Sequence, residues 1–357
     1  MNRNSSTSGS DAIWRRYTLA LLLGGLIPPL LLYLSILIID PYDSVPFAPD
    51  WDHYPPRGDH RHWNTKLLKQ QEFDSLVLGT STAMLLRPTT LNAAFGGRFV
   101  NLSMPLASPF EQLRILDLFQ YHHARMGTVI VDMDFLWCHP EGMRQYPNEK
   151  LRRGFPAWLY DTNPWNDLPP FNKTTLKSAY NQARAMLGIH RPYERWLDGC
   201  EDLTKTLHKH NDPAAIRKRI YEDIPETLID NPDLPQDTLY PDIKRLNEAL
   251  GRLPSGTLKI LFFPPFHERY QPPLGSRQDI LWNGCKTRVA DMAKSLDNLI
   301  VVDFLIHSPI SRNDSNYIDG YHYTTEIATQ IVNWLHEAVN APDNPNGEFR
   351  ILARSLH

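Results

Sequence analysis

The most informative stretch for the fold is Phe73-Asp-Ser-Leu-Val-Leu-Gly-Thr-Ser81. Its first part, Phe73–Leu78, ends in an apolar run that is typical of a buried strand. Gly79 and Thr80 follow directly and predict a tight turn. Ser81 would therefore lie just past the carboxyl end of a strand.

Four other short segments have the composition of buried strands, and helical patterns separate several of them. The strands are expected at Arg98–Leu102, Gly127–Asp132, Leu258–Phe263 and Asn298–Asp303. Helices are expected at Asn64–Gln71, Phe110–Ala124, Thr174–Leu187, Ala214–Glu222, Ile280–Ser295 and Thr325–Val339. Short apolar strands that alternate with helices predict an α/β fold with a parallel sheet, covered by helices on both faces.

An uncharged apolar run near the N-terminus, Tyr17–Ile39, predicts a membrane-spanning helix. At about 1.5 Å per residue it is long enough to cross a hydrocarbon core about 30 Å thick. Basic residues precede the run and acidic residues follow it, namely Arg3, Arg15 and Arg16 before it and Asp40, Asp43, Asp50 and Asp52 after it. The positive-inside rule then places residues 1–16 in the cytoplasm as a tail, residues 17–39 in the membrane, and the rest of the chain outside.

A cleaved signal peptide and a buried core helix are two other interpretations of this run. A signal peptide usually has an apolar stretch of about 7–15 residues that ends in small residues. The run here is longer and ends Ile36-Leu-Ile-Ile39, without a small-residue cleavage pattern. A core helix fits poorly so close to a polar N-terminus. We therefore expect an uncleaved single-pass anchor in the inner (cytoplasmic) membrane, with the main domain on the periplasmic or extracellular side.

Composition divides the rest of the chain into three parts. Residues 40–72, rich in Pro, Asp, His and aromatic residues, are expected to form a linker. Residues 73–340 contain all the expected strands and form the α/β domain. Within this domain, residues 139–250 carry Pro, Trp, Tyr and mixed charges with weak periodicity, which indicates an insertion or cap over the core. Residues 341–357 are polar and are expected to form a frayed tail.

The net charge and the cysteines bear on the class of the protein. The net charge of −3 implies no basic surface for nucleic acid. The three cysteines, Cys138, Cys200 and Cys285, are too sparse for a disulfide framework and lack zinc-ligand spacing. One disulfide bridge and three free thiols both fit the sequence.

The histidine-rich segments lack the surroundings of a metal site. They are His60-Arg-His62, His122-His123 and His208-Lys-His210. None has Cys, Asp or Glu at ligand spacing, so solvated surface is the better interpretation. We expect no metal and no organic cofactor.

A second informative segment, Asn316-Tyr-Ile-Asp-Gly-Tyr-His-Tyr323, lies just ahead of the last expected helix. It places Asp319 and His322 three residues apart. Ser, His and Asp are the side chains that together make a hydroxyl nucleophilic near neutral pH. Ser81 could instead be a helix N-cap, and His322 an ordinary surface histidine. Because all three residue types occur in matching contexts, we favour a catalytic interpretation.

Polar residues also follow other expected strands. Asp134 follows the third strand and His267 follows the fourth, as Ser81 follows the first. In parallel sheets, ligands bind outside the carboxyl ends of the strands. His267 would then line a substrate cleft, and the alternative is a solvated loop histidine.

The two segments resemble the motifs of the SGNH (GDSL-like) hydrolases and of their membrane-anchored relatives that acylate exported polysaccharides. In that family a strand ends in Gly-Asp-Ser or a variant such as Gly-Thr-Ser, which Gly79–Ser81 matches. The family closes with Asp-x-x-His before the last helix, which Asp319–His322 matches. The resemblance covers roughly residues 73–135 and 258–336. It implies a three-layer, flavodoxin-like parallel sheet, with a serine nucleophile, a histidine base and an aspartate that orients the histidine.

Two positions of the family pattern differ in this chain. The second block of the family supplies a glycine N–H to the oxyanion hole, but residues 101–108 contain no glycine. A main-chain N–H of Leu106, Ala107 or Ser108 could take its place. The third block supplies an asparagine, where this chain has Asp134, and an ionised carboxylate would repel a developing oxyanion.

The resemblance implies a serine esterase or O-acyltransferase that works through an acyl-serine intermediate, with acetyl as the group removed or transferred. The implied substrate is an exported polysaccharide or a small ester, and a membrane-bound partner would supply the acyl group. The alternative is a catalytically inactive protein of the same fold that binds glycan or scaffolds a secretion complex. The two differences favour the alternative, and the intact Ser, His and Asp favour the enzyme.

Overall fold

The structure is a computed structural model that describes residues 7–54, 59–142, 154–163, 167–189, 199, 212–222, 239–341 and 347–356, with only the backbone for 7–10. The chain divides into two compact units. The smaller comprises Met1–Gly58 and Asn163–Tyr193, and the larger comprises Asp59–Thr162 and Glu194–His357.

The larger unit is built on a six-stranded sheet in the order β2-β1-β3-β4-β5-β6, in which all strands but β6 are parallel. The strands are β1 (Ser75–Leu78), β2 (Phe99–Asn101), β3 (Thr128–Asp132), β4 (Leu258–Phe263), β5 (Leu299–Asp303) and β6 (Arg350–Ser355). Every residue of β1, β2, β3 and β5 is buried, as in a parallel sheet covered on both faces. The predicted α/β class and the five predicted strands are confirmed.

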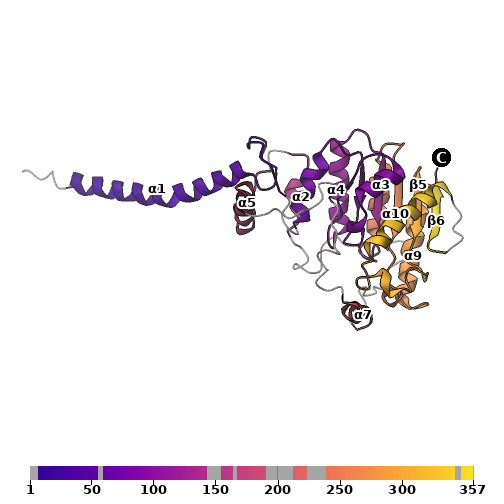
Figure 1. Ribbon diagram of the computed structural model, residues 1–357. Helices are drawn as coiled ribbons and strands as arrows, with labels where there is room; N and C mark the ends of the chain where they lie inside the picture. The colour runs from indigo at the N-terminus through magenta and orange to yellow at the C-terminus, as the bar shows by residue number, and fades with distance from the viewer. Residues whose placement is uncertain are drawn as a thin grey trace, which may run out of the picture. The chain divides into compact units, whose positions relative to one another are not determined.

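Helices connect these strands (Figure 1). Those of the larger unit are α2 (His60–Lys69), α3 (Pro88–Phe95), α4 (Pro109–His122), α7 (Pro213–Tyr221), α8 (Pro241–Gly251), α9 (Arg277–Asp291) and α10 (Thr325–Asn340). Short 3-10 turns include η1 (Ala83–Leu85), η5 (Glu268–Tyr270) and η7 (Asp314–Asn316). α3 and α8 were not predicted from the sequence, although each begins with proline, a residue that favours the first turn of a helix.

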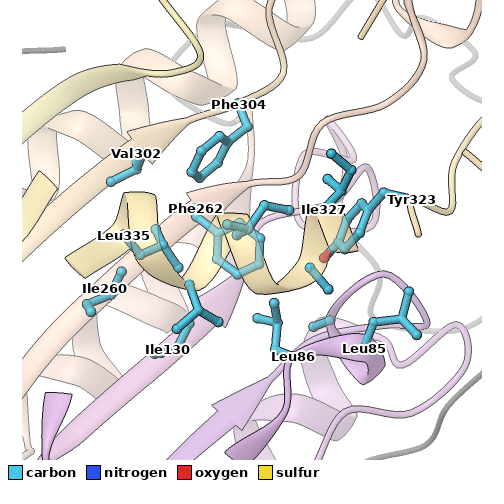
Figure 2. Packing of buried hydrophobic residues seen from close by; sticks show 14 of the residues in the cluster. Leu85, Leu86, Ile130, Ile260, Phe262, Val302, Phe304, Tyr323, Ile327 and Leu335 are labelled. Atoms are coloured by element: carbon cyan, nitrogen blue, oxygen red, sulfur yellow. The ribbon is translucent and has the colours of Figure 1, made fainter. Parts of the chain in front are cut away.

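One face of the sheet packs against α3 and α10 in a single apolar core (Figure 2). The core includes residues next to Ser81 and next to His322. Leu85 and Leu86 come just after Ser81, and Tyr323 comes directly after His322. Shared packing therefore brings together two parts of the chain that are distant in sequence.

The smaller unit contains α1 (Thr7–Ile39) and α5 (Lys173–Met186). Over Asp11–Ile39, α1 is long and apolar enough to span a membrane, as expected for a single anchor. The rings of Tyr33 in α1 and Phe171 just before α5 meet edge to face, with centroids 5.8 Å apart. Part of the expected insertion therefore packs with the anchor segment in this unit.

The helix expected at Asn64–Gln71, inside the expected linker of residues 40–72, is present as α2. A different stretch, expected to be irregular, contains regular structure. Arg350–Ser355, placed in a polar tail by the sequence analysis, form β6 and pair antiparallel with β5. Just before β6, Phe349 is 3% exposed and packs on Phe304. The tail assignment was wrong here because the residues of an edge strand are only partly buried and form no continuous apolar run.

A disulfide joins Cys138, after β3, to Cys285 in α9. The sequence left one bridge and three free thiols open, and the structure has the bridge. The third cysteine, Cys200, lies outside the described residues.

Candidate active site

The turn after β1 carries Ser81 on a backbone that runs close to β3. A Cβ atom at Gly79 would lie 2.6 Å from the Cβ atoms of both Asp132 and Ala83, which is closer than atoms can approach. Only glycine fits this position, because any side chain would push the turn away from the sheet. Ser81 itself is half-buried.

The buried side chain of Asn101, at the end of β2, fixes the segment that follows Ser81. Its amide nitrogen donates to the carbonyl oxygens of Ala83 and Leu86, at 2.8 and 2.9 Å. Its oxygen accepts from the backbone N–H of Ser103 at 3.0 Å. No role for Asn101 was predicted from the sequence. The feature that could have indicated one is a polar residue at the end of a buried strand.

The loop before α10 holds Asp319 against His322. One carboxylate oxygen of Asp319 accepts the backbone N–H groups of Tyr321 and His322, each at 2.8 Å. Burial would raise the pKa of the Asp319 carboxyl, but the His322 side chain and these N–H donors together outweigh burial and lower the pKa. Asp319 is therefore ionised at neutral pH.

The three side chains form one continuous chain of hydrogen bonds. Nδ1 of His322 lies 2.8 Å from Oδ2 of Asp319, and Nε2 lies 2.7 Å from Oγ of Ser81. Because the ionised carboxylate can only accept, Nδ1 carries the proton and Nε2 is free to accept the proton of Ser81. The predicted proximity of these residues is confirmed, and the arrangement is that of a serine nucleophile with its base.

A second hydrogen bond ties the same two segments together beneath Ser81. The hydroxyl of Tyr323, which is fully buried, donates to the carbonyl oxygen of Thr82 at 2.6 Å. The hydroxyl of Thr82 in turn donates to the Asp132 carboxyl group. Residues adjacent to Ser81 and His322 thus fix their separation, and no pattern in the sequence predicts this contact.

Aromatic rings pack around the Asp319–His322 loop. A Cβ atom on Gly320 would lie 2.0 Å from the ring of Tyr270, so only glycine lets the loop pass that ring. The ring of Tyr321 meets those of Phe266 and Tyr270 edge to face, with centroids 5.0 and 4.8 Å apart. This packing restricts the positions open to the loop.

Two of the three main-chain N–H groups named as candidate oxyanion donors, those of Ala107 and Ser108, are engaged elsewhere. The N–H of Ala107 donates to the carbonyl of Met104 at 3.1 Å. The N–H of Ser108 donates to the Glu111 carboxylate at 2.7 Å, within the capping box that starts α4. The N–H of Ser81, by contrast, makes no hydrogen bond within the described part of the chain. It is therefore a better candidate donor to an oxyanion formed beside Ser81.

Asp134 is buried and forms a carboxyl pair with Asp132. Its Oδ1 accepts the backbone N–H of Leu136 at 2.9 Å. Burial raises the pKa of Asp134 to about 7, and burial together with the neighbouring Asp134 raises the pKa of Asp132 well above its ordinary value. The pair therefore holds a proton near neutral pH, and the repulsion expected from an ionised Asp134 is reduced.

His267 lies in a closed position rather than on an open cleft wall. Its side chain is 1% exposed, and Nδ1 accepts the backbone N–H of Arg269 at 3.2 Å. Nε2 then carries the proton and lies 3.1 Å from the Asp314 carboxylate. The side chain caps η5, and both ring nitrogens are engaged.

The histidine-rich segments have other partners where they are described. Nδ1 of His62 bonds to Asp59 at 2.7 Å, and His123 bonds to the carbonyl of Leu68 at 2.7 Å. His208-Lys-His210 lies outside the described residues. No group of metal-ligating side chains is found around Ser81 within the described ranges.

Comparison with known proteins adds no relative from which a function could be transferred. No family model matches the chain, and no similar sequence is found among curated proteins. A functional conclusion therefore depends on the site geometry and on the motif resemblance.

Proposed function

We propose that the protein is a membrane-anchored, extracytoplasmic SGNH-like serine acyltransferase or esterase, acting on acetyl groups of an exported polysaccharide. One observation carries this proposal: the hydrogen-bonded chain from Ser81 through His322 to Asp319. A half-buried serine in this arrangement is activated for attack on an ester.

The reaction has two steps. His322 Nε2 takes the proton of Ser81 while Oγ attacks the acyl carbonyl, and Asp319 stabilises the imidazolium. Collapse of the tetrahedral intermediate passes that proton to the departing alcohol and leaves an acyl-serine. An acceptor hydroxyl, activated by the neutral His322, then takes the acyl group and regenerates the serine. A water acceptor gives an esterase, and a sugar hydroxyl gives an O-acyltransferase.

The strand order supports an SGNH-like assignment. The order β2-β1-β3-β4-β5 is that of flavodoxin-like sheets, whose ligands bind at the carboxyl ends of the strands. Ser81 lies in the turn just past the end of β1, after Gly79 and Thr80. We therefore assign the flavodoxin-like, three-layer variant of the α/β class.

The anchor and the disulfide support an extracytoplasmic location. Disulfides persist in oxidising compartments and are rare in the cytosol. The Cys138–Cys285 bridge follows the anchor in the chain, on the side that the positive-inside rule places outside. We place the larger unit at the outer face of the cytoplasmic membrane, where a membrane-bound partner would deliver the acyl group.

Hydrolysis of a nitrophenyl acetate by the full-length protein in detergent tests the proposal. Ser81→Ala and His322→Ala should each lower kcat by at least about 10³-fold, because each removes a group that acts at the reacting atoms. Intact-mass measurement should find an acetyl adduct on the parent protein, which peptide mapping places on Ser81.

Ser315→Ala is the matched control, since Ser315 is exposed and bonds only locally to Asn313. It should keep full turnover and the adduct. Equal turnover in Ser81→Ala and the control would reject the assigned nucleophile. Supplying an oligosaccharide acceptor and measuring acetylated sugar against free acetate distinguishes transferase from esterase.

A catalytically inactive protein that binds glycan or scaffolds a secretion complex is the second candidate. The engaged N–H groups of Ala107 and Ser108 favour it, because loss of one oxyanion donor costs about 10²–10³-fold in turnover. Glycan binding by both the parent protein and Ser81→Ala, with no adduct on either, would support this function over catalysis.

A further inference from the structure

Three potential metal ligands come together directly after α1, in the smaller unit. They are Asp40, the first residue after α1, with Asp43 and His53 in the loop that follows. Their ligand atoms all lie within 4.8 Å of one another. Two carboxylates alone would be an ordinary acidic cluster. Whether this cluster can bind a metal ion therefore depends on the surroundings of His53.

Backbone contacts fix the loop around this cluster. The two carboxylate oxygens of Asp40 accept the N–H groups of Ser44 and Val45, at 3.0 and 2.9 Å. The indole of Trp51 donates to the carbonyl of Ile38 at 2.6 Å, which returns the chain to the end of α1. Each carboxylate oxygen that accepts one N–H keeps a second lone pair.

The orientation of His53 is determined by its other ring nitrogen. Nε2 lies 2.7 Å from the main-chain carbonyl oxygen of Asp40. Since a carbonyl oxygen can only accept, Nε2 carries the proton, and in the neutral ring Nδ1 has a bare lone pair. A histidine that donates one N–H to a backbone carbonyl and presents the other nitrogen to a ligand is the usual arrangement at metal sites.

Nδ1 of His53 lies in the cluster without a hydrogen bond. The side chain is 3% exposed, and Nδ1 has no hydrogen-bond partner in the part of the chain that the structure describes. Oδ1 of Asp43 lies 3.5 Å from this nitrogen. By contrast, His62 Nδ1 contacts Asp59 directly at 2.7 Å, which leaves no space for an ion. A buried lone pair without a partner costs free energy, and a cation between this nitrogen and the carboxylate oxygen 3.5 Å away would remove that cost.

We propose that Asp40, Asp43 and His53 bind a divalent transition-metal ion, with Zn²⁺ the first candidate. Ligand bonds of about 2.0–2.2 Å that meet at a tetrahedral angle place their atoms about 3.3–3.6 Å apart. The 3.5 Å between Nδ1 and Asp43 Oδ1 fits this separation. A mixed imidazole and carboxylate set suits zinc and its neighbours better than magnesium or calcium, which prefer oxygen alone.

The ion would stabilise the junction between the membrane helix and the rest of the chain. It joins Asp40, the first residue after α1, to His53, thirteen positions later, and so closes the intervening loop. The site does not depend on the acyl-transfer chemistry at Ser81 and can be tested without an activity assay.

The test measures metal on the full-length protein, purified in detergent through an affinity tag without histidine. After equilibration with Zn²⁺ and gel filtration, elemental analysis should find one zinc per chain. Competition with a chromophoric chelator should show that His53→Ala weakens zinc binding more than the ~10–100-fold typical of losing an outer-shell partner. Cobalt should give a visible absorption band in the parent protein that His53→Ala lacks.

His62→Ala is the matched control, a second histidine paired with an aspartate, and it should bind zinc like the parent protein. Asp43→Asn removes a ligand charge at a position whose side chain is 37% exposed, so it provides a variant that keeps the fold and should also lose zinc. Circular dichroism checks folding of each variant. No zinc on the parent protein, or equal zinc on parent, His53→Ala and Asp43→Asn, would overturn the proposal.

Discussion

Two buried tyrosines beside the candidate site differ in one contact. Tyr317 and Tyr323 belong to the same core, pair through an isolated β-bridge, and are 1% and 0% exposed. The Tyr323 hydroxyl donates to the Thr82 carbonyl, whereas the Tyr317 hydroxyl has no partner among the described residues. The pair therefore isolates the effect of one hydrogen bond next to Ser81.

Tyr323→Phe should destabilise the fold by about 1–3 kcal/mol, because it leaves a buried carbonyl without a donor. It should also lower kcat for ester hydrolysis while leaving KM nearly unchanged, since Ser81 and His322 lose a contact that sets their separation. Urea unfolding and steady-state kinetics measure the two effects.

Tyr317→Phe is the control and should be neutral or slightly stabilising, because it removes a buried hydroxyl that makes no hydrogen bond. Equal losses of kcat in both variants would mean that the contact to Thr82 does not position the site.

At the level of the elements, the end of β3 has the most unusual chemistry. Asp132 is its last residue and Asp134 lies two residues beyond, both buried under the turn that carries Ser81. Asp132 accepts the hydroxyl of Thr82, which links the strand end to that turn. The folded state binds protons at this pair more tightly than the unfolded chain does, because burial raises both pKa values.

This difference predicts a pH dependence of stability. A carboxyl whose pKa is raised to about 7 on folding favours the folded state at low pH, and that contribution is lost as pH rises from about 4 to about 7. Asp134→Asn removes the titrating carboxyl at position 134 and keeps a side-chain oxygen that can accept the N–H of Leu136. Relative to the parent protein, the variant should gain roughly 2–3 kcal/mol of unfolding free energy between about pH 5 and about pH 8.

Urea unfolding at several pH values measures this gain. Asp117→Asn is the control, since its side chain is 46% exposed and pairs with Arg252 on the surface. If the unfolding free energies of Asp134→Asn and Asp117→Asn changed with pH in the same way, the proposed buried, titrating carboxyl pair at the end of β3 would be contradicted.

At the scale of the whole chain, the Cys138–Cys285 disulfide covalently joins two segments that are far apart in the sequence. It joins the loop after β3 to α9 across a separation of 147 residues. In the chain-entropy view, a bridge across so long a loop restricts the unfolded state strongly and stabilises by about 2–4 kcal/mol or more.

Cys285→Ser should therefore lower the free energy of unfolding by about 2–4 kcal/mol, and reductant should have the same effect on the parent protein. Cys200→Ser is the control and should keep both stability and the bridge. Non-reducing peptide mapping should recover Cys138 linked to Cys285 in the parent protein and in the control. Loss of that linked peptide in Cys200→Ser would show a different pairing.

Sequence patterns predicted the sheet well and its edges poorly. β1, β3, β4 and β5 are apolar runs because a parallel sheet is buried on both faces, so their pattern does not depend on a partner. β6 has no such pattern, because an edge strand is defined by its hydrogen bonds to β5 rather than by its side chains. α3 was missed for another reason: it has only eight residues, too few to show a helical period.

For the candidate site, the sequence predicted the members but not their surroundings. Ser81, Asp319 and His322 were found because each lies in a short local context, a strand end or the start of a helix. The engaged N–H groups of Ala107 and Ser108 could not be predicted, because main-chain hydrogen bonds depend on backbone geometry that side-chain identity does not specify.

The amino-acid order alone determined the α/β class, the apolar helix at the N-terminus and the candidate triad, because apolar period, length and residue type are local properties. Folding determined which atoms meet: Tyr323 with Thr82, Asp132 beside Asp134, Cys138 with Cys285, and His53 with the two aspartates. Such contacts need angles and distances within a few tenths of an ångström between segments far apart in the chain. Only packing of the complete core fixes these, since local propensity constrains each segment without constraining its partner.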